Sequence, residues 1–262
     1  MLRPTPLKPA DPDPTSRPNS RPARRPRPRV ALLGLALAAL FAAGCAADRA
    51  PPPRESSVSP DINAPYLRGV DVDEWIERFE AAGREIFDLR DAIIVAAGIE
   101  PDMDVADVGA GTGLLTVLMA ERVGPGGSVV AVDIVPEFVH HIRRRADAQG
   151  LHNVHPHLGS ERSVKLPTNS VDLVFVCDTY HHFEYPLNMV DSIWRALRDD
   201  GELVVIDFRR VEGESSDWVM GHVRAGQEVF TLEIESMGFE LIEEIDLLEQ
   251  NYMLRFRKTS AP

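Results

Sequence analysis

Three glycines at alternate positions follow a short apolar stretch, and this arrangement suits the binding of a nucleotide. Gly109, Gly111 and Gly113 come directly after residues 105–108, which have the character of a strand. A glycine turn lets the backbone pass close to a ligand without a Cβ in the way. It also directs the free N–H groups at the start of the next helix toward whatever binds there. The dinucleotide-binding fingerprint would place its third glycine one position later, where this chain has Leu114.

An aspartate stands where the ribose of a nucleotide needs hydrogen-bond acceptors. Asp133 ends the next apolar stretch, residues 129–132, and lies 20 residues beyond Gly113. A carboxylate at that point accepts hydrogen bonds from both ribose hydroxyls. The glycine turn and Asp133 together therefore predict a nucleotide site.

A second group of reactive side chains follows the apolar run that ends at Cys177. Residues 178–186 contain Tyr180, His181 and His182, which are the candidate catalytic residues. In open α/β sheets, ligands bind at the carboxyl ends of the strands, so this loop should face the reacting group. Histidine titrates in the range in which a general base works. The alternative interpretation is that the two histidines hold the loop or pack beneath it.

Strands and helices in alternation are needed to position these residues, and the hydrophobic pattern predicts both. Strands are expected at residues 105–108, 129–132, around 152–157, up to 177, and at 202–208, 240–247 and 252–257. Helices are expected at residues 74–97, 112–122, 136–148, 187–197 and 222–237, with a polar loop, a candidate lid, at 212–217. The helix over residues 74–97 carries one apolar stripe and should end at Gly98. Its charged residues Arg84, Glu85 and Arg90 are expected on a solvated face rather than at the ligand.

The glycine turn, Asp133 and the later segments, in this order, resemble the class I S-adenosylmethionine (SAM) dependent methyltransferases over residues 74–258. The resemblance implies an α/β fold, namely a Rossmann-like, seven-stranded, mostly parallel sheet with helices on both faces and an antiparallel C-terminal hairpin. It also implies SAM as the cofactor and in-line transfer of its methyl group to a small-molecule acceptor, which the resemblance does not identify. The chain is most similar to the group that includes the ubiquinone and menaquinone C-methyltransferases.

The same resemblance assigns the residues that would hold SAM. They are Asp107, Gly109, Ala110, Gly111, Thr112, Gly113, Asp133, Ile134, Ser160, Glu161 and Asp178. The chain departs from the family after Gly159. Many relatives carry an acid directly after that glycine to contact the adenine end of SAM, whereas here Ser160 takes that place and Glu161 comes one later. A serine hydroxyl or a backbone N–H is left to make the adenine contact.

The first 65 residues have the layout of an export signal and a tether. Residues 30–43 form an apolar run of 14 residues behind a basic flank, which is too short to span a bilayer and is typical of a secretory signal peptide. The run ends in Ala-Ala-Gly-Cys45, which resembles a bacterial lipobox, and the family's cysteine is lipidated. We therefore expect a signal peptide over residues 1–44, a lipidated cysteine and flexible tether over 45–65, and the methyltransferase domain over 66–262, lipid-anchored in the bacterial cell envelope and facing the periplasm. The alternatives are a plain signal peptide and an uncleaved anchor.

Charge and cysteine content restrict the partners. The net charge is −13; residues 1–44 carry eight Lys/Arg and two acids, a charge of +6, so the rest of the chain carries −19. Such an acidic body repels phosphate backbones, which argues against a nucleic-acid substrate. The two cysteines, Cys45 and Cys177, form no disulfide framework or zinc motif, and Cys177 should be a small buried hydrophobe. The five histidines between His140 and His157 lack a completing carboxylate or cysteine, so no metal site is predicted.

The expected location leaves three interpretations of function. SAM is made in the cytoplasm, whereas a lipoprotein would face the periplasm. The first interpretation is an active methyltransferase, and the second is a non-catalytic envelope binding module that retains the fold. The third is a nucleotide-dependent oxidoreductase, which Leu114 disfavours. The intact glycines and Asp133 favour the enzyme.

Overall fold

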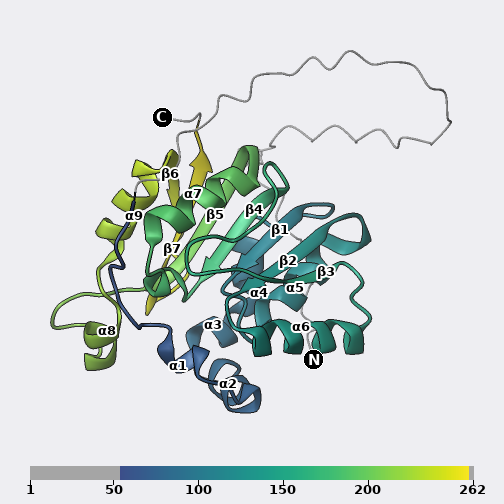
Figure 1. The fold of residues 1–262 in the computed structure, drawn as a ribbon, viewed down its shortest axis with the longest axis horizontal. Helices are drawn as coiled ribbons and strands as arrows, with labels where there is room; N and C mark the ends of the chain where they lie inside the picture. The colour runs from purple at the N-terminus through teal and green to yellow at the C-terminus, as the bar shows by residue number, and fades with distance from the viewer. Residues whose placement is uncertain (1–53, 260–262) are drawn as a thin grey trace, which may run out of the picture. The chain divides into compact units, whose positions relative to one another are not determined.

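The computed structural model describes residues 54–259, and a seven-stranded sheet forms their centre (Figure 1). The predicted signal peptide, Cys45 and the first part of the tether lie outside the described residues. The strands are β1 (Asp104–Val108), β2 (Ser128–Asp133), β3 (Val154–Leu158), β4 (Val171–Cys177), β5 (Leu197–Phe208), β6 (Phe239–Glu244) and β7 (Asn251–Lys258).

The sheet has the order β3-β2-β1-β4-β5-β7-β6. The first five strands pair in parallel, and β7 is antiparallel to both β5 and β6. The chain thus fills one half of the sheet outward from β1 and then returns to build the other half from β4. The predicted mostly parallel sheet with an antiparallel C-terminal hairpin is confirmed.

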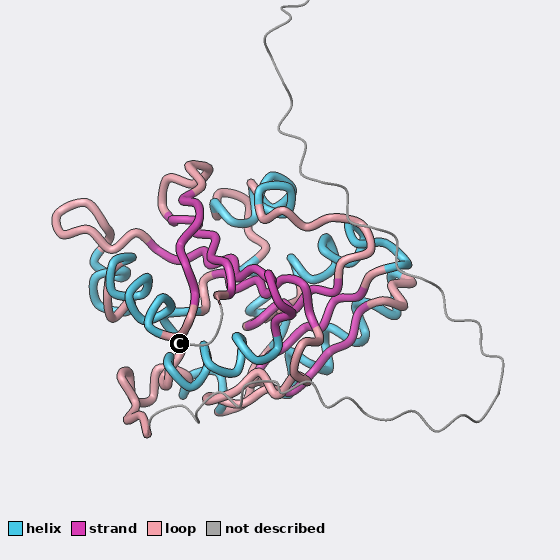
Figure 2. The backbone as a smooth tube through the Cα atoms, turned by 90° about the horizontal axis from the view of Figure 1, so that it is seen from above, coloured by secondary structure: helices cyan, strands magenta, loops and turns pink. Residues whose placement is uncertain are grey.

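Helices cover both faces of the sheet, as Figure 2 shows. They are α1 (Ala64–Leu67), α2 (Val72–Phe79), α3 (Glu85–Asp88), α4 (Arg90–Ala96), α5 (Leu114–Val123), α6 (Pro136–Gln149), α7 (Pro186–Ala196), α8 (Asp217–His222) and α9 (Gln227–Ser236), with short 3₁₀ turns η1 (Gly124–Gly126) and η2 (Tyr180–His182). Residues of α7, α8 and α9 join the hydrophobic core on one face, and residues of α4, α5 and α6 join the core on the other.

The central strands are apolar on both sides because both faces are covered. In β4, Val174 and Val176 belong to the core beneath α7 and α9, whereas Leu173 and Phe175 belong to the core beneath α4 and α5. This alternation follows from the two-residue period of a strand. It fixes the register of the sheet, and with it the position of the residues that follow each strand.

The helix predicted over residues 74–97 is wrong, since the chain forms α2, α3 and α4 there instead. The break lies at Gly83, whose φ of +92° is incompatible with a continuing helix and whose N–H donates to the Asp88 carboxylate at 3.0 Å. The apolar stripe runs on across the break, so the pattern did not reveal it. As a result, Arg84 lies at a turn and not on an exposed helix face.

The prediction of one continuous helix over residues 222–237 is also wrong. The structure has two helices, α8 and α9, separated by residues 223–226. The first begins inside the predicted polar loop because the Ser216 side chain caps it by accepting the N–H of Val219. His222 therefore ends a short helix instead of starting a long one.

The segment before α1 is bound to the rest of the domain. The Glu55 carboxylate accepts the N–H groups of Leu187 and Asn188 at the start of α7, at 3.0 and 2.9 Å. Val58 donates its N–H to the carbonyl of Glu184 at 2.9 Å. Contact with the domain thus begins by residue 55, within the stretch that the sequence analysis assigned to the tether.

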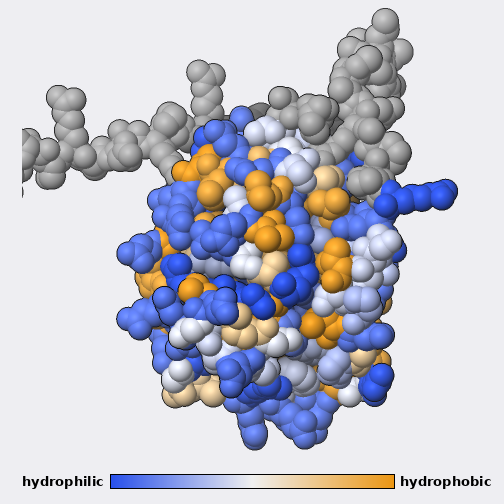
Figure 3. Space-filling view, turned by 90° about the vertical axis from the view of Figure 1, so that its left-hand side faces the viewer, coloured by the Kyte–Doolittle hydropathy of each residue, from blue (hydrophilic) through white to orange (hydrophobic). Residues whose placement is uncertain are grey.

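The surface seen in Figure 3 is mainly hydrophilic, with hydrophobic side chains in small separate areas. This agrees with the acidic composition of the domain. Between residues 54 and 259, no helix combines the length and the apolar character needed to cross a bilayer.

Candidate active site

A cavity of about 450 Å³ lies at the carboxyl ends of β1, β2 and β4. At this point the chain leaves one half of the sheet for the other, and such a switch point is where open α/β sheets bind ligands. The volume is that of a site for a molecule of nucleoside size. Its walls come from the glycine turn after β1, the segments after β2 and β4, and the N-terminal helices.

The glycine turn forms the floor of this cavity. Gly109, Gly111 and Gly113 have φ values of +77°, +55° and +78°, which side chains rarely adopt. A Cβ on Gly109 would stand 2.2 Å from Cγ2 of Thr179, so this position has no room for a side chain. Gly113 does not line the cavity; a Cβ there would stand 2.9 Å from Ile142, so this glycine allows α5 to pack against α6.

Asp133 presents its carboxylate to the cavity from the end of β2. One oxygen accepts the N–H of Gly111 at 2.8 Å, and the other accepts the N–H of Val135 at 2.9 Å. Each oxygen keeps a lone pair for a further donor. Burial raises the pKa of Asp133 to about 6, although the backbone N–H groups oppose the shift.

Asp107 supports the turn from beneath. The Thr116 hydroxyl donates to its carboxylate at 2.6 Å, which ties the end of β1 to the first turns of α5. Burial raises the pKa of Asp107 to about 7, and the hydrogen bond from Thr116 opposes this shift. Asp107, Ala110 and Thr112 line the cavity, as the sequence analysis expected of cofactor-binding residues.

Ser160 does not present free donors to the adenine end of the predicted site, although the sequence analysis expected it to. The N–H and the hydroxyl of Ser160 both donate to the carbonyl of Ser163, at 3.0 and 3.3 Å. These donors are therefore used within the local turn. Ile134, Ser160 and Glu161 all line the cavity.

Arg84 reaches the cavity, contrary to the expectation of a solvated face. Its guanidinium donates to the Asp178 carboxylate at 2.5 Å, and Asn251 donates to the other oxygen of Asp178 at 2.6 Å. Burial raises the pKa of Asp178, and the Arg84 charge opposes the shift. By contrast, Glu85 binds backbone N–H groups of residues 249–251, and Arg90 lies over the ring of Phe87 at 4.5 Å.

Aromatic side chains close the cavity above the glycine turn. Tyr66 of α1 lies 4.7 Å from Trp75 of α2, measured between ring centroids, and Trp75 lies 5.0 Å from Phe79. Phe138 of α6 meets Trp75 edge-on at 6.5 Å. These rings line the cavity and offer π faces, which attract cationic ligands.

The two predicted histidines line the cavity, with distinct surroundings. His181 is almost fully buried, and its Nδ1 lies 2.7 Å from the Asp207 carboxylate. Burial alone would lower the pKa of His181, but the charge and hydrogen bond of Asp207 outweigh burial and raise it. Burial, together with His181 and His222, lowers the pKa of His182 to about 2. His182 is therefore neutral at physiological pH.

Tyr180 and His222 differ from the sequence analysis in their placement. Tyr180 is fully buried outside the cavity lining, and its hydroxyl donates to Glu233 at 3.2 Å. His222, from α8, lines the cavity, and its ring centroid lies 5.2 Å from that of His181 and 5.1 Å from that of His182. Nothing near His222 in the sequence signals this role, because 40 residues separate it from His182.

The chain is similar in sequence to known methyltransferases. Residues 105–201 match the family model described as a methyltransferase domain. The chain is 30% identical over 173 residues to nocamycin O-methyltransferase of Saccharothrix syringae, a match that covers 66% of this chain and 59% of the relative. It is 33% identical over 119 residues to a ubiquinone/menaquinone biosynthesis C-methyltransferase of Hydrogenovibrio crunogenus, covering 45% and 47%. The chain spans about half the length of these curated relatives.

Solved structures share the fold. A SAM-dependent methyltransferase from Aquifex aeolicus superposes with a TM-score of 0.65 at 24% identity and covers 73% of this chain and all of its own. The [4+2]-cyclase SpnF superposes with a TM-score of 0.60 at 15% identity, covering 76% and 93%. The second structure carries another reaction in its name, so the shared fold alone does not define the chemistry. The predicted fold is confirmed.

Proposed function

We propose that this protein is a SAM-dependent methyltransferase that acts on a small-molecule acceptor. The observation that carries the proposal is the buried Asp133 carboxylate, held by the N–H groups of Gly111 and Val135 at the rim of the glycine turn. The match of residues 105–201 to a methyltransferase domain supports it. When bound, SAM supplies a methyl group activated by a positively charged sulfur.

The residues of the cavity fit SAM at its nucleoside end. The two carboxylate oxygens of Asp133 are the acceptors that the ribose hydroxyls require. A Cβ on Gly109 would press on Thr179, so the turn leaves only backbone against the ligand. Ile134 and Phe138 provide apolar walls for a flat base, and Glu161 provides an acceptor at the same end.

The methionine end of SAM carries a carboxylate and an ammonium group, and the cavity offers partners for both. The guanidinium of Arg84 complements the carboxylate, and the carboxylate of Asp178 complements the ammonium. These two side chains already pair with one another at 2.5 Å. In the protein without SAM, this pairing compensates the charges of two partly buried side chains.

The acceptor is oriented by the wall made of His181, His182, His222, Phe208 and Trp218. Aromatic rings around it exclude water, and the protein's main task is to align the acceptor with the methyl group. Asp207 holds Nδ1 of His181, which leaves Nε2 of that ring able to take a proton from an acceptor hydroxyl. The neutral His182 accepts or orients without carrying charge.

Calorimetric titration of SAM, and separately of NAD, into the purified protein tests the proposal. We expect SAM to bind and NAD to give no response. The variant Asp133→Ala should weaken SAM binding by about 1.5–3 kcal/mol, because the ribose hydrogen bonds are charge-assisted. Asp147→Ala, an exposed aspartate of α6, is the matched control. Absence of SAM binding by a folded protein would favour a non-catalytic binding module with the same fold.

The location in the cell is a separate part of the proposal. The 14-residue apolar run and Cys45 support a lipid-anchored protein that faces the periplasm. Incorporation of a labelled fatty acid, followed by fractionation, tests it, with Cys45→Ser as the variant that should lose the label. A protein found unlabelled in the cytoplasm would contradict the anchor without affecting the SAM site.

A further inference from the structure

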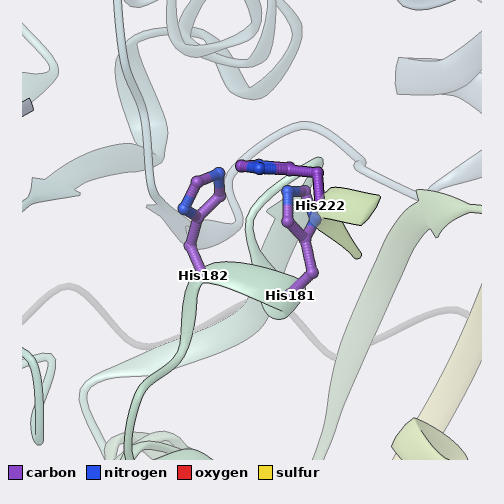
Figure 4. A group of neighbouring side chains, drawn as sticks. All are labelled: His181, His182 and His222. Atoms are coloured by element: carbon purple, nitrogen blue, oxygen red, sulfur yellow. The ribbon is translucent and has the colours of Figure 1, made fainter. Parts of the chain in front are cut away.

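Three histidines from two segments meet at the acceptor end of the cavity (Figure 4). His181 and His182 come from the turn after β4, and His222 comes from the end of α8. Each side chain offers one ring nitrogen, and these nitrogens lie within 4.8 Å of one another. We propose that His181, His182 and His222 bind a transition-metal ion, with Zn²⁺ as the reference ion, and leave one coordination position open toward the cavity.

The ligand set suits such an ion. Three imidazoles with an open fourth position are a recurrent arrangement for catalytic zinc, and imidazole also suits copper, iron and nickel. The sequence analysis predicted no metal site, because it considered the histidines between His140 and His157. The cluster proposed here depends on the fold, which brings α8 over the turn that contains His181 and His182.

His181 is already oriented as a metal ligand. Its Nδ1 lies 2.7 Å from one oxygen of Asp207, and its backbone N–H donates to the other oxygen at 3.0 Å. The N–H of Phe208 also donates to Asp207, at 2.8 Å. A buried carboxylate behind one ring nitrogen fixes the tautomer and leaves the lone pair of Nε2 for a metal, as in carboxylate–histidine–zinc sites.

His182 has a nitrogen that the described protein leaves without a partner. Its Nδ1 is buried and makes no hydrogen bond within residues 54–259. Its carbonyl accepts the side-chain N–H of Asn63 at 3.1 Å, which holds the backbone beneath the ring. A buried polar atom without a partner is unfavourable, and coordination of a metal by Nδ1 would give this atom a partner.

His222 is the ligand that can adjust. It ends α8, a helix of six residues, and Trp218 stacks on its ring with centroids 4.6 Å apart. Zinc–nitrogen bonds of about 2.0–2.1 Å in a tetrahedral site place ligand nitrogens about 3.4 Å apart. The three nitrogens must therefore approach by at most about 1.4 Å. Rotation of the half-buried His222 side chain supplies such a movement.

Packing alone is the competing explanation. The rings do contact one another, with centroids of His181 and His182 4.3 Å apart. Simple packing, however, requires neither converging nitrogens nor a fully buried carboxylate behind Nδ1 of His181. These two features together favour a metal site over an aromatic cluster.

A metal here would also define the acceptor class, a step that rests on the proposed function. An acceptor hydroxyl bound at the open position loses its proton to water more readily, because the metal stabilises the oxyanion. The oxyanion then forms an O–C bond with the methyl carbon as the C–S bond breaks, and its negative charge cancels the positive charge on sulfur. The expected acceptor is therefore a metal-binding hydroxyl compound, such as a phenol or an enol. In the metal-bound protein Nε2 of His181 is a ligand, so water and not this nitrogen takes the proton of the acceptor. The role of His181 as a base, given above, applies only to the metal-free protein.

Metal titration of the purified, untagged protein after treatment with a chelator tests the inference. We expect one Zn²⁺ per chain by calorimetry, and Co²⁺ substitution should give the visible absorption of a low-coordinate, nitrogen-bound ion. His222→Ala and His182→Ala should each weaken Zn²⁺ binding at least tenfold, and Asp207→Asn should weaken it about 10–100-fold through the orientation of His181. His140→Ala, an exposed histidine of α6, is the control and should bind as the unaltered protein does.

Two outcomes would overturn the inference. One is the absence of stoichiometric binding by a protein that melts cooperatively. The other is binding that survives His222→Ala and His182→Ala, which would locate the metal elsewhere. SAM titration of the same metal-free samples separates the two proposals, since loss of metal binding with intact SAM binding contradicts the metal site alone.

Discussion

The carboxylate of Asp207 lies 2.7 Å from Nδ1 of His181, at the end of β5 and entirely out of contact with solvent. The same side chain accepts two backbone N–H groups, those of His181 and Phe208. Asp207 thus joins the strand to the turn that carries the candidate catalytic histidines. The pair is part of the structure as well as of the site.

Replacing Asp207 by alanine should destabilise the protein strongly. The change leaves three donors without their acceptor, two of them buried, and the expected loss in the free energy of unfolding is about 2–5 kcal/mol. Urea denaturation measures it. Glu240→Ala, an exposed acid on β6, is the control and should change the free energy by less than about 0.5 kcal/mol. Equal stability of the two variants would show that Asp207 does not anchor the turn.

Gly109→Ala should abolish SAM binding because the new Cβ would stand 2.2 Å from the side chain of Thr179. The matched control is Gly213→Ala, since Gly213 has a φ of +80° and open space around its Cβ position. Both variants strain the backbone by about 1–2 kcal/mol, but only the first disturbs the cavity floor. Calorimetry with SAM and thermal melts of both proteins separate the clash from the strain. Identical SAM affinity in the two variants would contradict the placement of the cofactor.

Affinity for SAM should fall on acidification, because Asp133 has a pKa of about 6. The ionised carboxylate is the better acceptor for the ribose hydroxyls, so protonation below pH 6 weakens binding by on the order of tenfold for each pH unit. Calorimetry between pH 5 and pH 8 measures this dependence. Asp133→Asn should bind more weakly and lose the part of the pH dependence that Asp133 causes. A constant affinity in the unaltered protein would argue against a contact between Asp133 and SAM.

The raised pKa of Asp133 affects the stability of the ligand-free protein in the opposite direction, because stability should fall as pH rises whereas SAM affinity should increase. Asp133 and Asp107 bind protons more tightly in the folded protein than in the unfolded chain, with folded pKa values of about 6 and 7. The free energy of unfolding should therefore decrease as pH rises from about 4 to about 7, as far as these two groups determine it. Urea denaturation of the unaltered protein and of Asp107→Asn across that range provides the measurement. The variant should show the smaller decrease.

Arg84→Met should weaken SAM binding by about 10–100-fold, equivalent to about 1.5–3 kcal/mol for a lost charge-assisted hydrogen bond. Arg90→Met is the matched control, because Arg90 stands on Phe87 and donates to its carbonyl. Methionine keeps most of the packing of the arginine stem. Comparable affinities of the two variants would remove Arg84 from the site.

The sheet and the glycine turn were predictable because their signals are local. Strands buried on both faces read as apolar runs, and the glycines mark the turn that follows β1. Asp133 was found by its position at the end of the next such run. The helix break at Gly83 was not predictable, because the apolar periodicity continues across it. The break at residues 223–226 was not predictable either, because the Ser216 cap starts a separate helix inside a polar loop.

The two site residues that the sequence did not indicate, Arg84 and His222, both lie next to these helix breaks. Arg84 reaches Asp178 only because the chain turns at Gly83, and His222 reaches His181 only because α8 ends where it does. Arg84 and Asp178 are 94 positions apart in the sequence, and His181 and His222 are 41 positions apart. No local sequence pattern encodes contacts over such separations. For Ser160 the reason is different, because its donors are used by its own turn.

The contact of Glu55 with α7 limits how far the folded domain can lie from Cys45. Cys45 and Glu55 are only ten positions apart, and a fully extended chain covers about 3.3–3.6 Å per residue, or about 35 Å in all. A domain lipidated at Cys45 would thus stay in a thin layer next to the bilayer and would not diffuse through the rest of the periplasm. Acceptors that partition into the membrane surface would meet the site at a raised effective concentration, and freely dissolved ones would gain nothing.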